Sequence, residues 1–369
     1  MELKNDTDAL MDRVELYGFD VIDIANFDEL QEKGIITVKE GAKHYLYCGD
    51  RRYTSIVISN CPVLNEFTYG VSKDGHPYGY MDVSVPYDDY HNLNCLSPER
   101  YIVWIRTICR YLWDSYGLRI GAECIKYKKM EINKTIIIND AYSEYQRVLT
   151  LLMQILPGTL RLNTAAEIRG RDEHPEKVTD YRIKKETYQK TSGEKGITIK
   201  IYDKTKNLIE KYRIEITHNY LRYEITLNSA TKIRNTLGQN EICKISQETV
   251  NRYFSGFIRE NVENAYKKYK EKSDAAVLKI LKKNYVPANR TWIRDTVIEI
   301  MDIELKNGGV PLILDIHDLL MQLNHIKFSS RAQKSHAKKA FAEIAEKKAT
   351  ALSNRDDQKC MELIAKLKG

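Results

Sequence analysis

Long hydrophobic runs are missing from this sequence of 369 residues. Its best apolar segments, residues 135–138 and 310–314, fall far short of the roughly 18–20 residues that cross a bilayer, so we expect no membrane contact. The first residues, Met-Glu-Leu-Lys-Asn-Asp, also lack the basic start and the apolar stretch of a signal peptide. The sequence therefore predicts a cytoplasmic location.

Paired cysteines and the usual histidine motifs of metal sites are missing too. The seven cysteines are odd in number and scattered, and none belongs to a Cys-x-x-Cys pair. This usage is typical of reduced thiols and argues against a disulfide framework or a zinc ribbon. The eight histidines form neither a His-Glu-x-x-His motif nor a His-apolar-His pair. A metal site built from histidines is therefore not expected.

A large excess of one charge is also absent. The 58 lysines and arginines exceed the 51 aspartates and glutamates by seven, which permits a nucleic-acid partner without requiring one. The composition, 43% apolar and 30% charged, is that of a folded globular protein, and the length predicts two or three domains. Tyrosine is abundant, with 25 residues against 7 phenylalanines. Tyrosine serves strands and wet interfaces and can also act as a nucleophile, and composition does not choose among these roles.

The apolar spacing divides the chain into three parts. We expect an N-terminal leader over residues 1–40, a core of strands and helices over 41–270, and a helical C-terminal domain over 271–369. Within the leader, helices are expected over 9–17 and 27–33. Residues 169–196, polar and weakly periodic, predict a loop or a solvated arm. The expected strands are 44–48, 55–59, 66–71, 80–85, 125–138, 197–204 and 220–227. The other expected helices are 101–116, 141–156, 247–270, 276–284, 292–305, 315–323 and 331–352.

The first helix of the core has clear boundary signals. Ser97 is suited to cap its start, Pro98 to occupy its first position and Gly117 to end it. Strands followed by a helix occur twice along the core. The sequence therefore predicts an α+β fold, with a duplicated antiparallel sheet and helices on one face, followed by the helical domain.

Polar side chains gather on one face of several expected strands, because successive strand residues alternate faces. Over residues 197–204 the isoleucines share one face, and the other carries Lys200, Tyr202 and Lys204. The same alternation sets other acidic and basic residues opposite the apolar side chains. These are Asp82 on 80–85, Glu131 on 129–133, and Arg222 and Glu224 on 221–227.

If these strands belong to one sheet, three carboxylates and a tyrosine converge among cations. Carboxylate oxygens are ligands that Mg²⁺ and Mn²⁺ prefer, and such a metal neutralises charge on a scissile phosphate. A phenol has a pKa of about 10, so it needs a nearby cation, metal or base to attack at neutral pH. Tyr202 lies between Lys200 and Lys204 and has such neighbours. The alternative is that these charged residues face water and have no catalytic role.

A second basic group lies on the expected helix at the end of the chain. It consists of Arg331, Lys334, Lys338 and Lys339. Such a group marks either a solvated helix face or a surface that contacts nucleic-acid phosphates. We predict that Arg331, Lys334 and Lys338 bind DNA.

The core segments resemble the replication initiators of filamentous phages and related plasmids, the gene II/X family. The likeness lies in Asp82-Val-Ser-Val-Pro86 with His-Asn at 91–92, in Lys129-Met-Glu-Ile-Asn133, and in Ile201-Tyr-Asp-Lys204 leading to Leu221-Arg-Tyr-Glu-Ile-Thr-Leu227. The family shows an acidic residue before Ser-x-Pro, an Arg-apolar-Asp strand, a Tyr-x-Lys segment and an Arg-aromatic-Glu strand, in this order. The resemblance covers roughly residues 40–270.

The resemblance implies a rolling-circle initiator that nicks one strand of a plasmid or phage origin. Such an enzyme stays joined to the 5′ phosphate through a tyrosine and later rejoins the displaced strand. The nucleophile falls on Tyr202, the phosphate-contacting lysine on Lys204, and the Mg²⁺ or Mn²⁺ ligands on Asp82, Glu131 and Glu224. Lys200 and Arg222 are expected to bind DNA beside them. The partners implied are the double-stranded origin and the displaced single strand.

The sequence departs from the family pattern at two places. Glu131 stands where aspartate is usual, a chemically mild change. The loop after Ser-x-Pro is altered around Tyr90-His-Asn, which leaves the role of His91 open. The C-terminal domain has three candidate roles: origin binding, recruitment of a host helicase, or dimerisation.

Two other functions remain open. One is a non-catalytic, sequence-specific DNA-binding regulator that uses the same sheet and the basic helices. The other is a structural or host-interaction protein with no DNA role. Metal-dependent strand scission distinguishes the enzyme from the regulator, and salt-sensitive DNA binding distinguishes the regulator from the structural protein.

Overall fold

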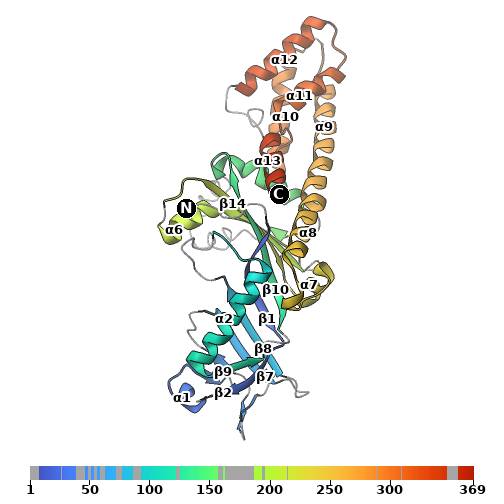
Figure 1. Ribbon diagram of the computed structural model, residues 1–369. Coiled ribbons are helices and arrows are strands. Elements are labelled where there is room, and N and C mark those ends of the chain that lie inside the picture. Colours follow the sequence, from blue (N-terminus) through green and yellow to red (C-terminus); the bar gives the residue numbers. More distant parts are fainter. Residues whose placement is uncertain are drawn as a thin grey trace.

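The fold is described from a computed structural model. It describes residues 8–25, 27–38, 46–48, 51–53, 56–58, 63–71, 77–85, 93–121, 125–156, 161–162, 187–192, 196–213, 215–287, 289–308, 310–346 and 356–369. The molecule is elongated, with an antiparallel sheet at one end and a helical projection at the other (Figure 1). This arrangement agrees with the predicted α+β class and helical C-terminal part, while a duplication of the sheet is not shown.

The main sheet has ten strands in the order β11-β12-β13-β14-β10-β1-β8-β7-β6-β3, and every pairing is antiparallel. Two short ribbons, β2-β9 and β4-β5, lie beside it. The predicted strands of the core are all found where the structure describes them. The strands are β1 (Leu10–Tyr17), β2 (Asp20–Ile24), β3 (Ile36–Val38), β4 (Leu46–Cys48), β5 (Arg51–Tyr53), β6 (Ile56–Ile58), β7 (Glu66–Val71), β8 (Pro77–Ser84), β9 (Leu118–Gly121), β10 (Lys126–Ile138), β11 (Arg161–Leu162), β12 (Thr187–Ser192), β13 (Ile197–Asp203) and β14 (Asn219–Leu227).

The expected helix over residues 9–17 is wrong. This segment is β1, which lies between β10 and β8 in the middle of the sheet. Its side chains at Met11, Val14 and Leu16 are fully buried. A bulge between Met11 and Val14 breaks the regular alternation, and the spacing from 11 to 14 therefore imitates a helical one. The start of the chain thus contributes a central strand.

Most helices of the core cover the apolar face of the sheet. The predicted signals around α2 (Pro98–Tyr116) are confirmed: Ser97 Oγ accepts a hydrogen bond from Arg100 N, and Gly117 ends the helix at φ +61°. A Cβ at Gly117 would lie 2.6 Å from the Ala25 side chain, so glycine is needed there. The other core helices are α1 (Phe27–Glu32), the 3₁₀ turn η2 (Tyr142–Tyr145), α3 (Gln146–Ile155), α6 (Lys204–Tyr212), α7 (Ala230–Leu237), η4 (Ile242–Lys244) and α8 (Gln247–Phe257).

Helix α6 is an exception to the prediction that helices lie on one face. Leu208 of α6 packs against Tyr220 and Ile137, which point to the face opposite α2. Leu93 joins the same small cluster. The polar sheet face is therefore covered at one end, and the residues beside α6 are withdrawn from solvent.

The projection begins with one long continuous helix. Helix α8 runs through a π-helical segment, η5 (Ile258–Glu263), into α9 (Asn264–Asn284). Beyond it, α10 (Trp292–Lys306), α11 (Ile316–Gln322), the 3₁₀ turn η6 (Leu323–His325) and α12 (Arg331–Glu346) enclose a second apolar core. We call residues 276–346 the head. The last helix, α13 (Asp356–Lys368), returns to the sheet, where Cys360, Leu363 and Ile364 join the main core (Figure 1).

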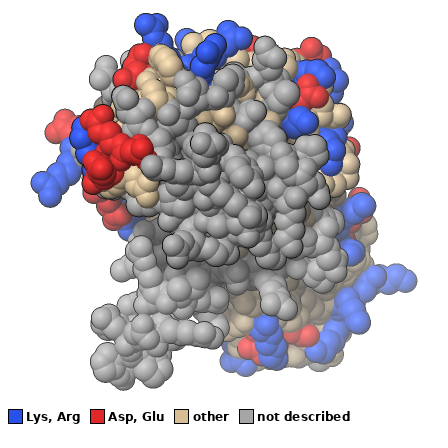
Figure 2. Space-filling model, turned by 90° about the horizontal axis from the view of Figure 1, so that it is seen from below, with Lys and Arg blue, Asp and Glu red and all other residues tan. Residues whose placement is uncertain are grey.

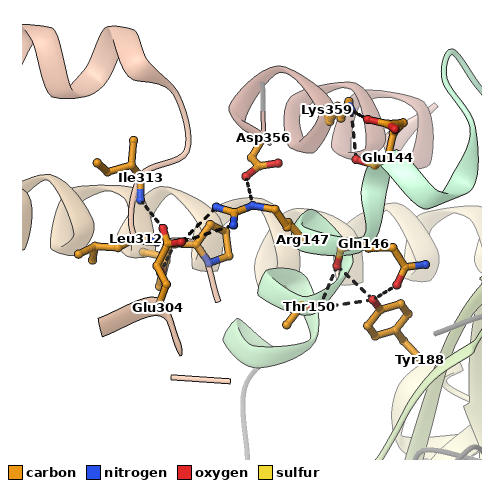
Figure 3. Close-up of polar contacts among 12 residues, drawn as sticks. Glu144, Gln146, Arg147, Thr150, Tyr188, Glu304, Leu312, Ile313, Asp356 and Lys359 are labelled. Atoms are coloured by element: carbon orange, nitrogen blue, oxygen red, sulfur yellow. Dashed lines mark hydrogen bonds and ion pairs between the residues drawn. The ribbon is translucent and has the colours of Figure 1, made fainter. Parts of the chain in front are cut away.

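Arg147 of α3 joins the base of the head to the sheet. Its Nε donates to Asp356 Oδ2 at 2.9 Å, and both terminal nitrogens lie 3.4 Å from Glu304 Oε2 (Figure 3). Glu304 also accepts from Leu312 N at 2.7 Å, and it is only 5% exposed. Because buried charges are stable only when paired, this contact fixes α3, α10 and α13 together.

Charged side chains of both signs are visible when the molecule is seen from below. The largest group of Asp and Glu lies on the left of this view, and Lys and Arg predominate at the top, right and bottom (Figure 2). In the described part of the chain, no helix is long and apolar enough to cross a membrane.

Candidate active site

Strand register places most of the predicted site residues on one face of the sheet. Tyr202 of β13 pairs with Arg222 of β14, which in turn pairs with Thr135 of β10. Two residues along, Lys200 pairs with Glu224. Directly paired residues share a face, so these side chains form one polar row across three strands. Strands β13, β14 and β10 are therefore neighbours in one sheet, whereas Asp82, the fourth side chain expected to converge with them, is on β8.

Tyr202 is held by a carboxylate on the neighbouring strand. Its Oη donates to Glu224 Oε1 at 2.7 Å, a diagonal contact between β13 and β14. Burial raises the pKa of Tyr202 above its ordinary value, and the nearby Glu224 adds to this rise while Arg222 opposes it. The phenol is therefore neutral at pH 7 and has a proton acceptor already in place.

Lys200 lies between two carboxylates. Its Nζ is 3.7 Å from Glu131 Oε1 and 3.6 Å from Glu224 Oε2. Burial alone would lower the pKa of Lys200, but Glu131 and Glu224 outweigh it and raise the pKa. Burial raises the pKa of Glu131 to about 7, with Lys200 acting against this shift. Lys200 thus neutralises a pair of carboxylates that would otherwise repel each other.

Arg222 is fully buried, with 0% exposure, and its guanidinium is hydrogen-bonded within the protein. Nε donates to Thr135 Oγ1 at 2.8 Å, and one terminal nitrogen donates to the Leu93 carbonyl at 2.9 Å. The other lies 3.1 Å from Asp12 Oδ2. This geometry gives Arg222 a positioning role beneath Tyr202, and its predicted contact with DNA has no support in it.

Asp12 is the site residue that the sequence did not reveal. It lies in the bulge of β1, which the sequence assigns to a helix of the leader. In a regular strand, buried residues alternate with polar ones, and this pattern would have indicated a strand at 10–17. The bulge between Met11 and Val14 shifts the alternation by one residue, so the pattern cannot be recognised in the sequence. Asp12 supplies the negative charge that a buried guanidinium needs.

Lys204 lies where β13 ends and α6 begins. Asp203 caps α6, because its Oδ1 accepts a hydrogen bond from Lys206 N at 2.9 Å. Lys204 is the first residue of the helix, and its side chain points into the protein. Lys204 is only 3% exposed. Burial, with Arg222 as the second cause, lowers the pKa of Lys204 to about 7. An amine with this pKa can give or take a proton at neutral pH.

Asp82, a predicted metal ligand, lies apart from the other two carboxylates. Strand β1 separates β8 from β10, and Asp82 forms an ion pair with Arg13, whose Nε lies 2.8 Å from Oδ1. Across residues 8–369, as far as the structure describes them, no group of three or more His, Cys, Asp or Glu side chains is placed to hold a metal ion. Glu131 and Glu224 are close enough to share one cation, and Lys200 takes that place.

The remaining predicted residues lie elsewhere. Arg331, Lys334 and Lys338 are on α12 in the head, far along the projection from β13 (Figure 1). His91 and the altered Tyr90-His-Asn loop are outside the described residues.

The arrangement combines a tyrosine, an adjacent carboxylate base and a near-neutral lysine. A tyrosine activated by a base is a nucleophile for acyl or phosphoryl centres. The cations Lys200, Lys204 and Arg222 favour an anionic substrate near Tyr202. Together these groups suit attack on a phosphodiester.

No protein-family model matches the sequence. No curated protein matches it either. Among solved structures, a rolling circle replication initiator protein from Geobacillus stearothermophilus is similar, with 10% sequence identity over 69% of this chain and 85% of that chain and a TM-score of 0.30.

Proposed function

We propose that this protein is a rolling-circle replication initiator that cleaves one strand of duplex origin DNA with Tyr202 and later rejoins it. The observation that carries the proposal is the 2.7 Å hydrogen bond from Tyr202 Oη to Glu224 Oε1, set among Lys200, Arg222 and Lys204. The order of the sequence motifs that resemble the gene II/X family supports it.

In the proposed step, Tyr202 Oη attacks the scissile phosphorus and its proton passes to Glu224. The bond from phosphorus to the 3′ oxygen breaks, and the 3′ oxygen takes up a proton. The products are a 5′ phosphotyrosine diester and a free 3′ hydroxyl. A diester replaces a diester, so a later attack by a 3′ hydroxyl reverses the reaction and rejoins the strand.

Lys204 is the proposed proton donor to the leaving 3′ oxygen. Its pKa of about 7 means that about half of the molecules carry the ammonium form at neutral pH. Lys200 and Arg222 stabilise the negative charge that develops on the phosphate, Lys200 directly and Arg222 through the field of its fixed guanidinium.

A divalent cation remains a prediction from the family resemblance. Asp82 is paired with Arg13, and Lys200 lies between Glu131 and Glu224, so the three predicted ligands do not meet around one point. No step above passes through a metal ion. The proposed partners, a host helicase and a second copy of the chain, likewise remain predictions for the head.

The test compares the wild-type protein with Tyr202→Phe on supercoiled DNA that carries the chain's own replicon, with Mn²⁺ or Mg²⁺ added. The wild type should give a nicked circle with protein linked to the 5′ end, and mass spectrometry of the digested product should place the nucleotide on Tyr202. We expect Tyr202→Phe to lose at least about 1000-fold in rate. Tyr80→Phe, on the same sheet face but on β8, is the matched control.

Full nicking by Tyr202→Phe would refute the assignment of the nucleophile. The second candidate function, a non-catalytic DNA-binding regulator, is favoured by one observation. Each carboxylate of the site already has a cation beside it, as a purely structural network would. That function predicts salt-sensitive binding of the same DNA with no strand scission under any metal condition.

A further inference from the structure

The head has the architecture of a small helical module around its own core. Trp292, Ile300, Leu319 and Phe341, from α10, α11 and α12, are all at most 8% exposed and belong to one apolar cluster. Tyr285 and Phe328 pack against Trp292 with ring centroids 5.3 and 6.3 Å away. Helix α12 is thus seated on a fixed platform.

Two helices of the head, α11 and α12, are arranged as a short supporting helix and a longer outer one. Asp315 caps α11 by accepting from His317 N at 2.8 Å. Ser330 Oγ accepts from Gln333 N at 3.2 Å at the start of α12. The turn between the helices is anchored by Leu323 and Ile326, which are buried in the head core. Helix-turn-helix DNA readers also present a second helix from a first one, but their turn has about 3–4 residues, whereas residues 323–330 separate α11 from α12.

The outward face of α12 carries small and basic side chains. Ala337 and Phe341 are buried against the head, which turns Ala332, Ser335 and Lys339 to solvent. Ala332 and Ser335 have small side chains, so the backbone of the first two turns can approach a partner closely. A major groove about 12 Å wide admits a helix of this kind.

The basic and acidic side chains of α12 are separated along the helix. Its five basic or ionisable nitrogen side chains all lie in the first nine residues, and its two glutamates, Glu343 and Glu346, come after them. The positive end of the helix dipole adds to the same N-terminal half. Lys339 is 3.8 Å from Glu343, an exposed pair that would readily exchange for a phosphate. The basic group is Arg331, Lys334, His336, Lys338 and Lys339.

We propose that α12 is the helix with which this protein reads duplex DNA, by entering the major groove with its N-terminal half. Ala332 and Ser335 would face the base edges, while Arg331, Lys334 and Lys338 would contact the phosphates on one side of the groove. The proposal deepens the proposed function and rests on it for the identity of this DNA as the origin. The binding itself does not depend on cleavage.

The joint at Arg147 gives this reading helix a fixed relation to Tyr202. Arg147 ties Glu304 of α10 and Asp356 of α13 to α3 (Figure 3). Helix α9, with 21 residues, is ~32 Å long and runs from the main core to the head. This length corresponds to on the order of 10 base pairs of B-DNA. The length of α9 thus sets the scale of the offset between the main core and the head at on the order of one helical turn of DNA.

The experiment measures binding of the full-length protein to a pool of 40-bp random duplexes by fluorescence anisotropy at several salt concentrations, followed by repeated selection and sequencing. The test variant is R331Q/K334Q/K338Q. The control variant, K268Q/K272Q/K279Q, removes the same charge from exposed positions of α9. We expect the α12 variant to lose about 10- to 100-fold in affinity at 150 mM salt and its salt slope to fall by about 2–3. The control should stay within about 3-fold of wild type.

A second variant tests groove entry separately from charge. Ser335→Trp keeps every cation but adds bulk on the outward face, and it should abolish the sequence preference found by selection in wild type. Equal losses in the α9 and α12 variants, or an unchanged preference in Ser335→Trp, would overturn the proposal. Failure of the proposed function gives a different result. In that case the wild-type protein would still select a preferred DNA sequence but would not cleave DNA that contains it.

Discussion

Tyr202 and Glu224 form a hydrogen bond 2.7 Å long between neighbouring strands, although they are not direct partners in the ladder. Each is opposite a cation instead: Tyr202 pairs with Arg222, and Glu224 with Lys200. The proposed nucleophile and its proposed base are therefore both placed by strands of the sheet, and their separation does not depend on a loop.

Changing Glu224 to Gln should slow strand cleavage. Glutamine keeps the shape and an acceptor oxygen for Tyr202 but cannot take up the phenolic proton. We expect the single-turnover cleavage rate to fall about 10²- to 10⁴-fold, measured with the wild-type substrate under the same metal condition. Glu66→Gln, at an exposed position of β7 on the same face of the sheet, is the control. A wild-type rate in Glu224→Gln would mean that another group accepts the proton.

Changing Asp12 to Asn should destabilise the protein strongly. Arg222 is fully buried, and Asp12 supplies the carboxylate 3.1 Å from it. Removing one partner leaves a buried charge uncompensated, which costs about 3–5 kcal/mol. Urea unfolding followed by circular dichroism measures this loss. Asp302→Asn, which breaks an exposed pair with Lys306, should leave the free energy of unfolding nearly unchanged.

Glu131 should make stability depend on pH between about 4.5 and 7. Its pKa is raised to about 7 in the fold, so the folded state holds a proton that the unfolded state loses near pH 4.5. The stabilisation is complete below pH 4.5 and is lost as the pH rises through 7. Relative to Glu131→Gln, the wild type should lose on the order of 2–3 kcal/mol between pH 4.5 and 7.5. Parallel urea titrations at the two pH values would show no such difference if Glu131 titrates normally.

Metal dependence should be more sensitive to Glu131 than to Asp82. Asp82 is already paired with Arg13 on the other side of β1, whereas Glu131 lies beside Glu224 and Lys200. We expect EDTA to abolish cleavage, Glu131→Gln to raise the Mn²⁺ concentration for half-maximal rate at least about 10-fold, and Asp82→Asn to change it less than about 3-fold. The reverse order would place the metal at Asp82.

Removing Arg147 should loosen the head from the sheet. Arg147→Met leaves Glu304 and Asp356 buried, at 5% and 2% exposure, without their cation. The expected loss is about 3–5 kcal/mol. Limited proteolysis should then cut between the head and α13 faster than in wild type. If the cleavage pattern is unchanged, other contacts, such as that of Tyr269 with the Pro311 carbonyl, suffice to hold the joint.

The sequence predicts those parts of the fold whose local signals and tertiary roles agree. Helix α2 has its cap, its first proline and its terminal glycine, and β13 and β14 alternate cleanly, so both their type and their polar face were predictable. Strand β1 was not, because a bulge gives it helical spacing. The partnership of Asp12 with Arg222 joins residues 210 apart, and only the strand order brings them together. The same holds for α13, which lies beyond the last helix expected from the sequence and whose return to the main core only the structure shows.

The return of α13 to the sheet has a consequence for how such a protein can change. The chain leaves the main core along α9 and belongs to it again in α13, so the head is an insertion into the main core. Under the two proposals above, a different head inserted at the same place would direct the protein to another DNA sequence and leave the residues around Tyr202 unchanged. Sequence recognition and strand cleavage would then be separable by exchanging one continuous segment of the chain.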